Sequence, residues 1–319
     1  MVMGKNRKLT LNFLSGLSIG LIVFIAFVDY LKNTSILFMP KEYKTLKKIV
    51  DKLASTNDLS YREIPFTITS GGYTGWIAEE LGLCKDDGCY YFSNLDPYKN
   101  HSKINGININ ELINQSNLLN GIEAYAWSGA VWISKSSFQA TGEEEGFIAC
   151  TIGHELSHIF FNDHIQQSIK LSNILKNTNE ESFQEFELYL IDKIGIYESN
   201  DLIGKELNFF ELKDLTELYL SRESESLADI NGSRMVINAG YERDICLKEL
   251  TFFTETGLYP TDTELDSTHP GYLERYETLE MFINNYVEPK DIISYESYKW
   301  KWIYNRRLNT LIFKPINQL

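Results

Sequence analysis

The sequence predicts an α+β fold that is mainly α-helical, with a small sheet and one N-terminal transmembrane helix before the folded domain. Three observations support this class. An uncharged apolar run lies near the N-terminus, most segments after residue 140 carry apolar side chains at helical spacing, and short runs typical of strands lie at 61–69, 123–138 and 298–315. At 319 residues, with 43% hydrophobic side chains, the chain can build a sizeable core.

The apolar run at residues 9–28 is uncharged and long enough, as a helix, to cross a hydrocarbon layer of about 30 Å. We therefore predict a single membrane anchor over 9–29. The tail before it, residues 1–8, carries Lys5, Arg7 and Lys8, so the positive-inside rule places this tail in the cytoplasm and the rest of the chain across the membrane. A cleaved signal peptide is the alternative, because Leu17 to Val28 has the length of an apolar h-region, although no small-x-small cleavage site is present.

The charge of the chain argues against one class of partner. Its net charge is −14, and the basic tail contributes positive charge, so the body is more acidic still. An acidic body repels phosphate backbones, which makes nucleic acid an unlikely partner.

The four cysteines fit an oxidising compartment without requiring one. Cys84 and Cys89 bracket the turn sequence KDDG, so either a disulfide or two free thiols are compatible with the spacing. Cys150 and Cys246 are interpreted as buried packing residues.

The elements of the first half follow in order. Residues 30–60 are predicted to form an amphipathic helix that links membrane to domain, because Leu46, Ile49, Val50 and Leu53 have helical spacing. A strand at 61–69, a Gly-rich turn and a short helix at 76–83 come next. Loops with one short helix at 109–115 are expected before two strand pieces, or one bulged strand, within 123–138.

The second half is predicted to be helical until its end. One helix runs from about Glu143–Glu145 to Asp163, helical periodicity continues through 165–221, and another helix ends at Gly240. A further helix opens at Pro270. Residues 298–315 alternate as a β-hairpin that turns near 305–307, so 61–286 is taken as the main domain and 287–319 as a hairpin extension.

The stretch CTIGHELSHIFF, residues 150–161, predicts a metal site. His154 and His158 are four residues apart, so on a helix both project from one face and can bind one ion. Zinc needs a third protein ligand if it is to activate a water, and Glu155 is placed to hold that water and accept its proton. The alternative is a helix whose two histidines are only solvated or packed.

A second acidic segment, residues 222–232, offers the third ligand. Glu225 and Asp229 are one helical turn apart, so one carboxylate can bind the metal while the other accepts the N–H of a ligand histidine. Glu223 competes for the ligand role from a different face. The small Ala228 and Gly232 would let this helix pack closely on the first, whereas the alternative is a solvated acidic face.

Three motifs in order, HELSH, RxxExxADxxG and STHPxxxxR, resemble the HtpX and CAAX prenyl endopeptidase group of zinc metallopeptidases, which are gluzincins with a zincin-like fold. The resemblance implies one Zn²⁺ per chain, held by His154, His158 and Glu225, with Glu155 as general base and Asp229 beside a ligand histidine. It also implies that His269 and Arg275 hold or polarise the substrate near the metal, or that His269 caps the zinc.

The strand before the metal helix corresponds to the one that pairs with an extended substrate in such enzymes. We assign substrate binding there to four consecutive residues, Ser128, Gly129, Ala130 and Val131. His101 and His164 receive no role. One predicted anchor rather than several resembles single-anchor or exported members of the group.

The sequence thus predicts a membrane-anchored zinc metalloendopeptidase with an extracytoplasmic catalytic domain, periplasmic or extracellular, acting on misfolded or exported proteins. The alternatives are a catalytically capped zinc-binding chaperone or interaction module at the membrane, and a structural protein stabilised by zinc.

Overall fold

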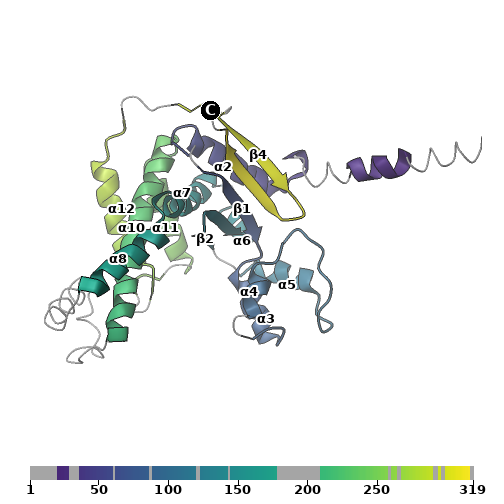
Figure 1. Cartoon of the computed structure of the whole chain (residues 1–319), viewed down its shortest axis with the longest axis horizontal. Coiled ribbons are helices and arrows are strands. Elements are labelled where there is room, and N and C mark those ends of the chain that lie inside the picture. The colour runs from purple at the N-terminus through teal and green to yellow at the C-terminus, as the bar shows by residue number, and fades with distance from the viewer. Residues whose placement is uncertain are drawn as a thin grey trace, which may run out of the picture.

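The computed structural model describes residues 20–28, 36–59, 62–85, 88–119, 123–142, 144–177, 209–257, 260–263, 267–289, 294–295 and 299–316 (Figure 1). The predicted cytoplasmic tail, most of the predicted anchor, and residues 178–208 of the segment with predicted helical periodicity lie outside these residues.

Residues 20–28 form a helix that projects from the rest of the molecule (Figure 1). The large apolar residues 21–25 and Phe27 in it are more than half exposed. Within the described ranges, no helix combines the length and the apolar character needed to cross a bilayer. The anchor over 9–29 therefore stays a prediction.

A five-stranded sheet forms among the described residues, in the order β2-β3-β1-β5-β4. Its strands are β1 (Ile64–Thr69), β2 (Ala124–Trp127), β3 (Ala130–Ser134), β4 (Trp300–Asn305) and β5 (Thr310–Pro315). Only β1 and β3 are parallel to each other. The positive φ angles of Ser128 and Gly129, 49° and 83°, make a two-residue hairpin turn, so the predicted alternative of two strand pieces is confirmed and the bulge is not.

The core extends beyond the predicted limits of 61 and 286. Helix α2 (Lys41–Ala54), which follows the short η1 (Ile36–Phe38), buries its apolar face in the same cluster as the sheet. The Tyr43 hydroxyl donates to the Asn309 carbonyl at 2.7 Å and accepts from the Ile68 amide at 3.0 Å. Strand β5 pairs with β1, so the C-terminal hairpin completes the sheet instead of extending from it.

Three short helices, α3 (Gly72–Glu80), α4 (Cys89–Ser93) and α5 (Ile109–Ser116), form a separate group beside the sheet (Figure 1). They enclose a second small apolar cluster around Phe92 and Leu112. A disulfide joins Cys84 to Cys89, which decides between the two alternatives left open by the sequence.

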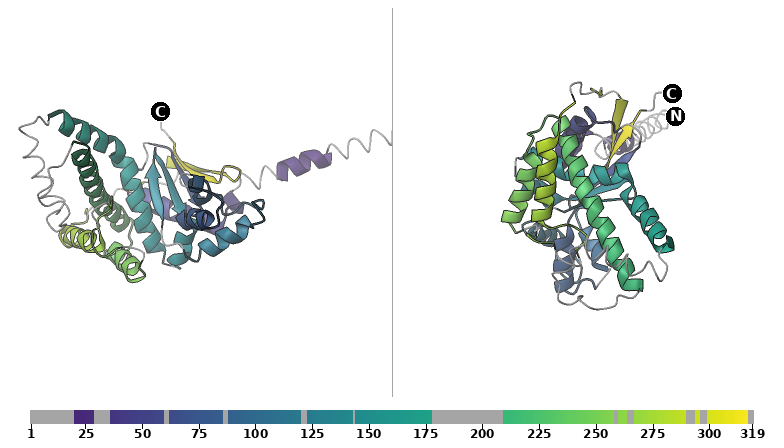
Figure 2. Two further views of the ribbon diagram at one scale, coloured as in Figure 1. Left: turned by 90° about the horizontal axis from the view of Figure 1, so that it is seen from below. Right: turned by 90° about the vertical axis from the view of Figure 1, so that its left-hand side faces the viewer.

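The remaining helices are α6 (Lys135–Ala140), α7 (Glu145–Phe161), α8 (Asp163–Asn177), α10 (Phe209–Asn238), α11 (Ile245–Glu255) and α12 (Tyr272–Asn285). Helix α7 contacts β2 and β3 on one side and α10 and α11 on the other. Helices α8 and α10 lie side by side at the end of the molecule opposite residues 20–28 (Figure 2). This places the predicted metal helix at the centre of the fold.

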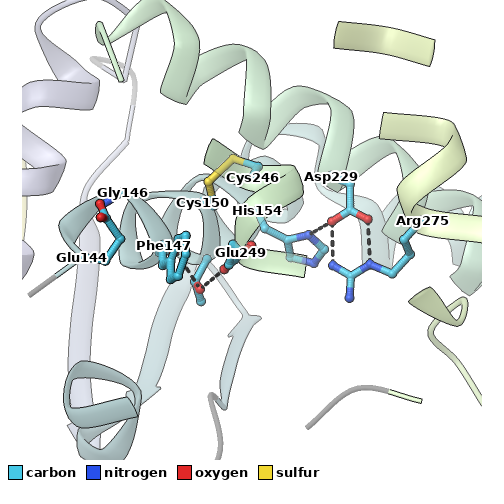
Figure 3. The surroundings of a disulfide bond; sticks show 10 residues. Glu144, Gly146, Phe147, Cys150, His154, Asp229, Cys246, Glu249 and Arg275 are labelled. Carbon is cyan, nitrogen blue, oxygen red and sulfur yellow. Dashed lines mark hydrogen bonds and ion pairs between the residues drawn. A yellow bond between two sulfur atoms is a disulfide. The ribbon is translucent and has the colours of Figure 1, made fainter. Parts of the chain in front are cut away.

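The interpretation of Cys150 and Cys246 as buried packing residues is right about their burial but misses their bond to each other. Both are buried, but α11 packs on α7 and brings their Cα atoms to 5.5 Å, and a disulfide joins them (Figure 3). No sequence signal links two cysteines 96 residues apart, because only the packing of the two helices brings them together.

Candidate metal centre

Helix α7 presents the two histidines from its C-terminal half. The Glu144 side chain caps its start by accepting from the Gly146 amide at 3.3 Å, and Asn162 ends it with a left-handed φ of 50°. His154 and His158 project from one face, as their spacing predicts, and their rings lie 4.8 Å apart between centroids.

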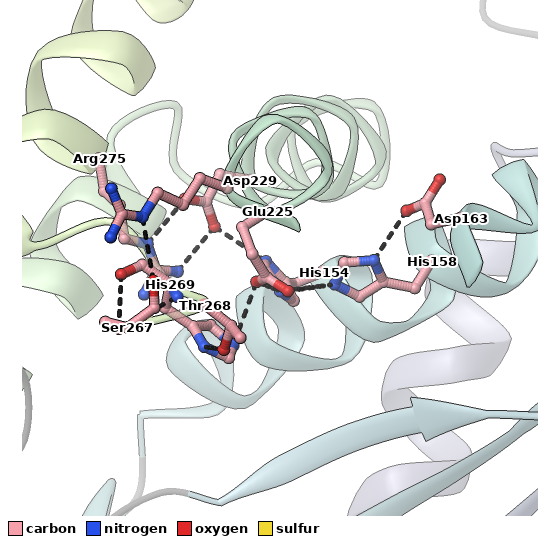
Figure 4. A network of polar contacts seen from close by, with 10 residues as sticks. His154, His158, Asp163, Glu225, Asp229, Ser267, Thr268, His269 and Arg275 are labelled. Carbon is pink, nitrogen blue, oxygen red and sulfur yellow. Dashed lines mark hydrogen bonds and ion pairs between the residues drawn. The ribbon is translucent and has the colours of Figure 1, made fainter. Parts of the chain in front are cut away.

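Helix α10 reaches these histidines because the two helices cross at glycines. A Cβ at Gly153 would lie 2.9 Å from the Gly232 carbonyl oxygen, and a Cβ at Gly232 would lie 2.6 Å from the His154 backbone nitrogen. No larger side chain fits this crossing. Glu225 and Asp229 lie seven and three residues before Gly232, on the same face, so the crossing brings both carboxylates to His154 (Figure 4).

Three donor atoms converge on one point. The Nε2 atoms of His154 and His158 are 3.1 Å apart, and Glu225 oxygens lie 3.0 Å from the first and 3.4 Å from the second. Tetrahedral zinc ligands at about 2.0 to 2.1 Å from the ion would be about 3.3 Å from each other. Among the described residues, these three side chains form a group that could hold a metal ion. Their spacing fits zinc.

Two further carboxylates hold the imidazole rings. Asp229 accepts from His154 Nδ1 at 2.9 Å, and Asp163 accepts from His158 Nδ1 at 2.7 Å (Figure 4). These contacts fix the orientation of each ring and turn its Nε2 towards the common point, where its lone pair can bind an ion. Asp163 was missed by the sequence analysis, because it lies beyond the helix end and reaches back only through the turn at Asn162.

Replacing Asp163 by Asn is expected to weaken zinc binding about 10- to 100-fold, because His158 loses the carboxylate that fixes its tautomer and orientation. The dissociation constant is to be measured by competition with a chromophoric zinc chelator. Asp214→Asn, at a mostly exposed side chain of α10, serves as the control. Equal zinc affinity of the two variants would show that Asp163 does not support the centre.

The pKa values of the acids at the centre are shifted in different directions. Burial alone would raise the pKa of Glu225, but its contacts with His154 and His158 hold that pKa well below its ordinary value, so the carboxylate is ionised. Burial likewise opposes ionisation of Asp229, yet the charge and hydrogen bonds of Arg275 lower its pKa. For Glu155, burial is the largest effect and raises the pKa, which makes it a stronger base than an exposed carboxylate.

Arg275 contacts Asp229, and His269 lies beside Glu225. Arg275 donates from Nε and Nη2 to the two Asp229 oxygens at 2.8 and 2.7 Å, so in this structure its guanidinium holds Asp229. His269 is 59% exposed, with Nε2 3.3 Å from a Glu225 oxygen, and its Nδ1 lies 3.0 Å from the Thr268 hydroxyl.

Other predicted candidates are placed elsewhere. The Glu223 side chain is 41% exposed and pairs with Lys170 at 2.8 Å, away from the histidines. Ser128 and Gly129 form the β2–β3 turn, whereas Ala130 and Val131 lie on β3, which has β1 on one side and β2 on the other. The expectation of an exposed edge at Val131 is corrected, since this residue is fully buried and the edge strand is β2.

Two cavities flank the centre. The larger, about 1050 Å³, is bordered by His158, Arg62, Trp127 and α8 residues such as Ile165. The smaller, about 500 Å³, is bordered by His154, Glu155, Arg275 and Glu249. The donor atoms thus lie between the two cavities. The smaller cavity borders the start of β2 and the larger one borders its end.

Glu249 of α11 is a buried acid that the sequence analysis did not single out. It accepts a hydrogen bond from the Thr151 hydroxyl at 2.7 Å, and burial raises its pKa to about 7 (Figure 3). Its ordinary pKa is 4.5. The folded state therefore keeps a proton that the unfolded chain releases, so this group's contribution to stability is full below pH 4.5 and is lost as the pH rises through 7.

Replacing Glu249 by Gln is expected to stabilise the protein increasingly as the pH rises, because the amide mimics the protonated acid. The difference in free energy of unfolding from the parent protein should grow by at most about 3 kcal/mol between about pH 5 and about pH 8. Urea titrations at both pH values measure it. An equal difference in free energy of unfolding at the two pH values would contradict the raised pKa of Glu249.

Two imidazoles from an HExxH helix and a carboxylate from a second helix, beside the edge strand of a small sheet, define the metal centre of a zincin-type metallopeptidase. The model of peptidase family M48 matches residues 106–283, which include every residue of the centre, and the chain belongs to this family. No curated protein and no solved structure matches the chain.

Proposed function

We propose that this protein is a zinc-dependent metalloendopeptidase, similar to HtpX and the CAAX prenyl endopeptidases, that cleaves misfolded or exported proteins. The observation that carries the proposal is the convergence of His154, His158 and Glu225 on one point, with Glu155 beside it. When bound, Zn²⁺ would supply Lewis-acid chemistry, increasing the acidity of water and polarising the scissile carbonyl.

The residues of the chain divide the remaining work. Glu155 takes the proton of the attacking water and passes it to the leaving amine. His269 is accessible from solvent beside Glu225 and offers an N–H to the oxyanion that forms on attack. Arg275 contributes positive charge from behind Asp229 and keeps that carboxylate aligned with His154.

The edge strand β2 supports binding of an extended polypeptide. Among the described strands β2 pairs with β3 alone, so its other edge is available to a substrate strand. Antiparallel pairing, the more stable arrangement, would run the substrate from the larger cavity near Trp127 to the smaller one near Ala124. Backbone pairing of this kind favours unfolded segments over folded ones.

We also propose that the chain is anchored through residues 9–29, with the catalytic domain periplasmic or extracellular. The two disulfides support an oxidising compartment for that domain. Protease added to intact cells should remove the C-terminal body while sparing the N-terminal tail. Where the cells have an outer membrane, spheroplasts are used in place of intact cells, so that protease reaches a periplasmic body. A body that is digested only after the inner membrane is lysed would contradict this orientation.

Metal removal tests the central proposal. The full-length protein in detergent should contain one zinc per chain by atomic absorption and should cleave unfolded casein. A chelator should abolish cleavage by removing the ligand-bound ion, and added Zn²⁺ should restore it. Stoichiometric zinc with no cleavage of any unfolded substrate would favour the capped binding module instead.

A further inference from the structure

Glu249 differs from the other charged groups around the smaller cavity, because the charges of Arg275 and His154 act on it without an ion pair among the described residues. Arg275 and Asp229 neutralise each other, the Glu123 carboxylate accepts from the Gly72 amide at 2.5 Å, and Glu155 serves the chemistry. Glu249 is only 6% exposed, and its one hydrogen bond comes from the neutral Thr151. Within the described residues, no cation pairs with it at ion-pair distance.

A buried carboxylate without a cationic partner is costly, so it is retained either as a neutral acid or for a cation that enters from outside. The cavity offers the second possibility, since Glu249 borders a space of about 500 Å³ that also reaches Glu155. Apolar side chains of Leu250 and Leu279 border the same space. Such walls suit the methylene stem of a long cationic side chain whose charged end meets the carboxylate.

The direction in which the substrate strand runs along β2 decides which of its side chains enters the smaller cavity. Glu123, Ala124 and Tyr125, at the start of β2, border the smaller cavity, whereas Ala126 and Trp127 border the larger one. A substrate strand antiparallel to β2 therefore brings residues on the C-terminal side of the scissile bond to Glu249.

We infer that Glu249 makes the smaller cavity a subsite for a lysine or arginine side chain immediately after the scissile bond. This inference rests on the proposed peptidase function and states which substrate side chain the enzyme prefers after the cleaved bond. The Glu249 carboxylate accepts a charge-assisted hydrogen bond from the incoming ammonium or guanidinium group, and Thr151 holds the carboxylate in place.

The test uses two peptides that differ only in arginine or leucine after the cleaved bond, with the bond located by mass spectrometry. The parent protein should have the higher kcat/KM for the arginine peptide, and Glu249→Gln should lower the arginine-to-leucine ratio about 10- to 100-fold. Glu249→Asp, which keeps the charge, should retain an arginine preference. Glu255→Gln, at an exposed position on the same helix, should leave the ratio at the parent value.

A binding measurement separates this inference from the proposed function. With Glu155→Gln as background, the arginine peptide should bind more tightly than the leucine peptide, and adding Glu249→Gln should remove the difference. The subsite would be overturned if the Glu155→Gln protein bound both peptides equally. It would also be overturned if the arginine peptide still bound more tightly after Glu249→Gln was added. Absence of cleavage with the binding preference intact would instead overturn only the peptidase function.

Discussion

Replacing Glu155 by Gln is expected to reduce cleavage of unfolded casein by about 10²- to 10⁴-fold while leaving zinc at one ion per chain. The amide has nearly the same size as the carboxylate but cannot accept the proton of the attacking water. Glu155 does not belong to the three-donor group, so metal binding should persist. Casein cleavage and atomic absorption on the same preparation provide both measurements.

The control for this result is Glu280→Gln, at an exposed position of α12, which should keep full activity. Cleavage by Glu155→Gln at the parent rate, with zinc bound, would remove the general-base mechanism. Loss of zinc together with activity would instead assign Glu155 a structural role in the centre.

Replacing Gly232 by Ala should disrupt the centre although this residue contacts no substrate. The added Cβ would lie 2.6 Å from the His154 backbone nitrogen, so α7 and α10 must separate. Overpacking of this kind costs about 1 to 3 kcal/mol of stability. Because Glu225 and Asp229 move with α10, the metal geometry should be lost and activity should fall about 100-fold or more.

Urea unfolding, zinc content and casein cleavage should be compared with those of Gly88→Ala. At Gly88 the nearest atom to an added Cβ is Cys84 Cβ at 3.8 Å, an ordinary contact, and its φ is −64°. Gly88→Ala should therefore behave as the parent protein. Normal zinc content in Gly232→Ala would show that the crossing tolerates a methyl group and that the close approach does not set the centre.

The sequence predicted which side chains come together at the candidate metal centre, because its signals are local. His154 and His158, and likewise Glu225, Asp229 and Gly232, are related by helical spacing within single helices, and the structure brings the two sets together. The helix over 145–161, the short helix at 109–116 and the C-terminal hairpin were predicted for the same reason.

What the sequence could not predict depends on tertiary packing. The Cys150–Cys246 disulfide needs α11 to lie on α7, and the identity of β2 as the edge strand needs the order of the whole sheet. Helix α2 has an amphipathic pattern that suits a membrane linker and a core helix equally well. Only its packing partners, such as Asn309, distinguish the two.

The disulfide between α7 and α11 has a mechanical consequence. It attaches one turn before His154 on the first helix and three residues before Glu249 on the second. A movement of α11 is therefore passed to the histidine helix through covalent bonds rather than through side-chain contacts alone. The disulfide thus links the helix of the inferred subsite covalently to the helix that carries His154 and Glu155.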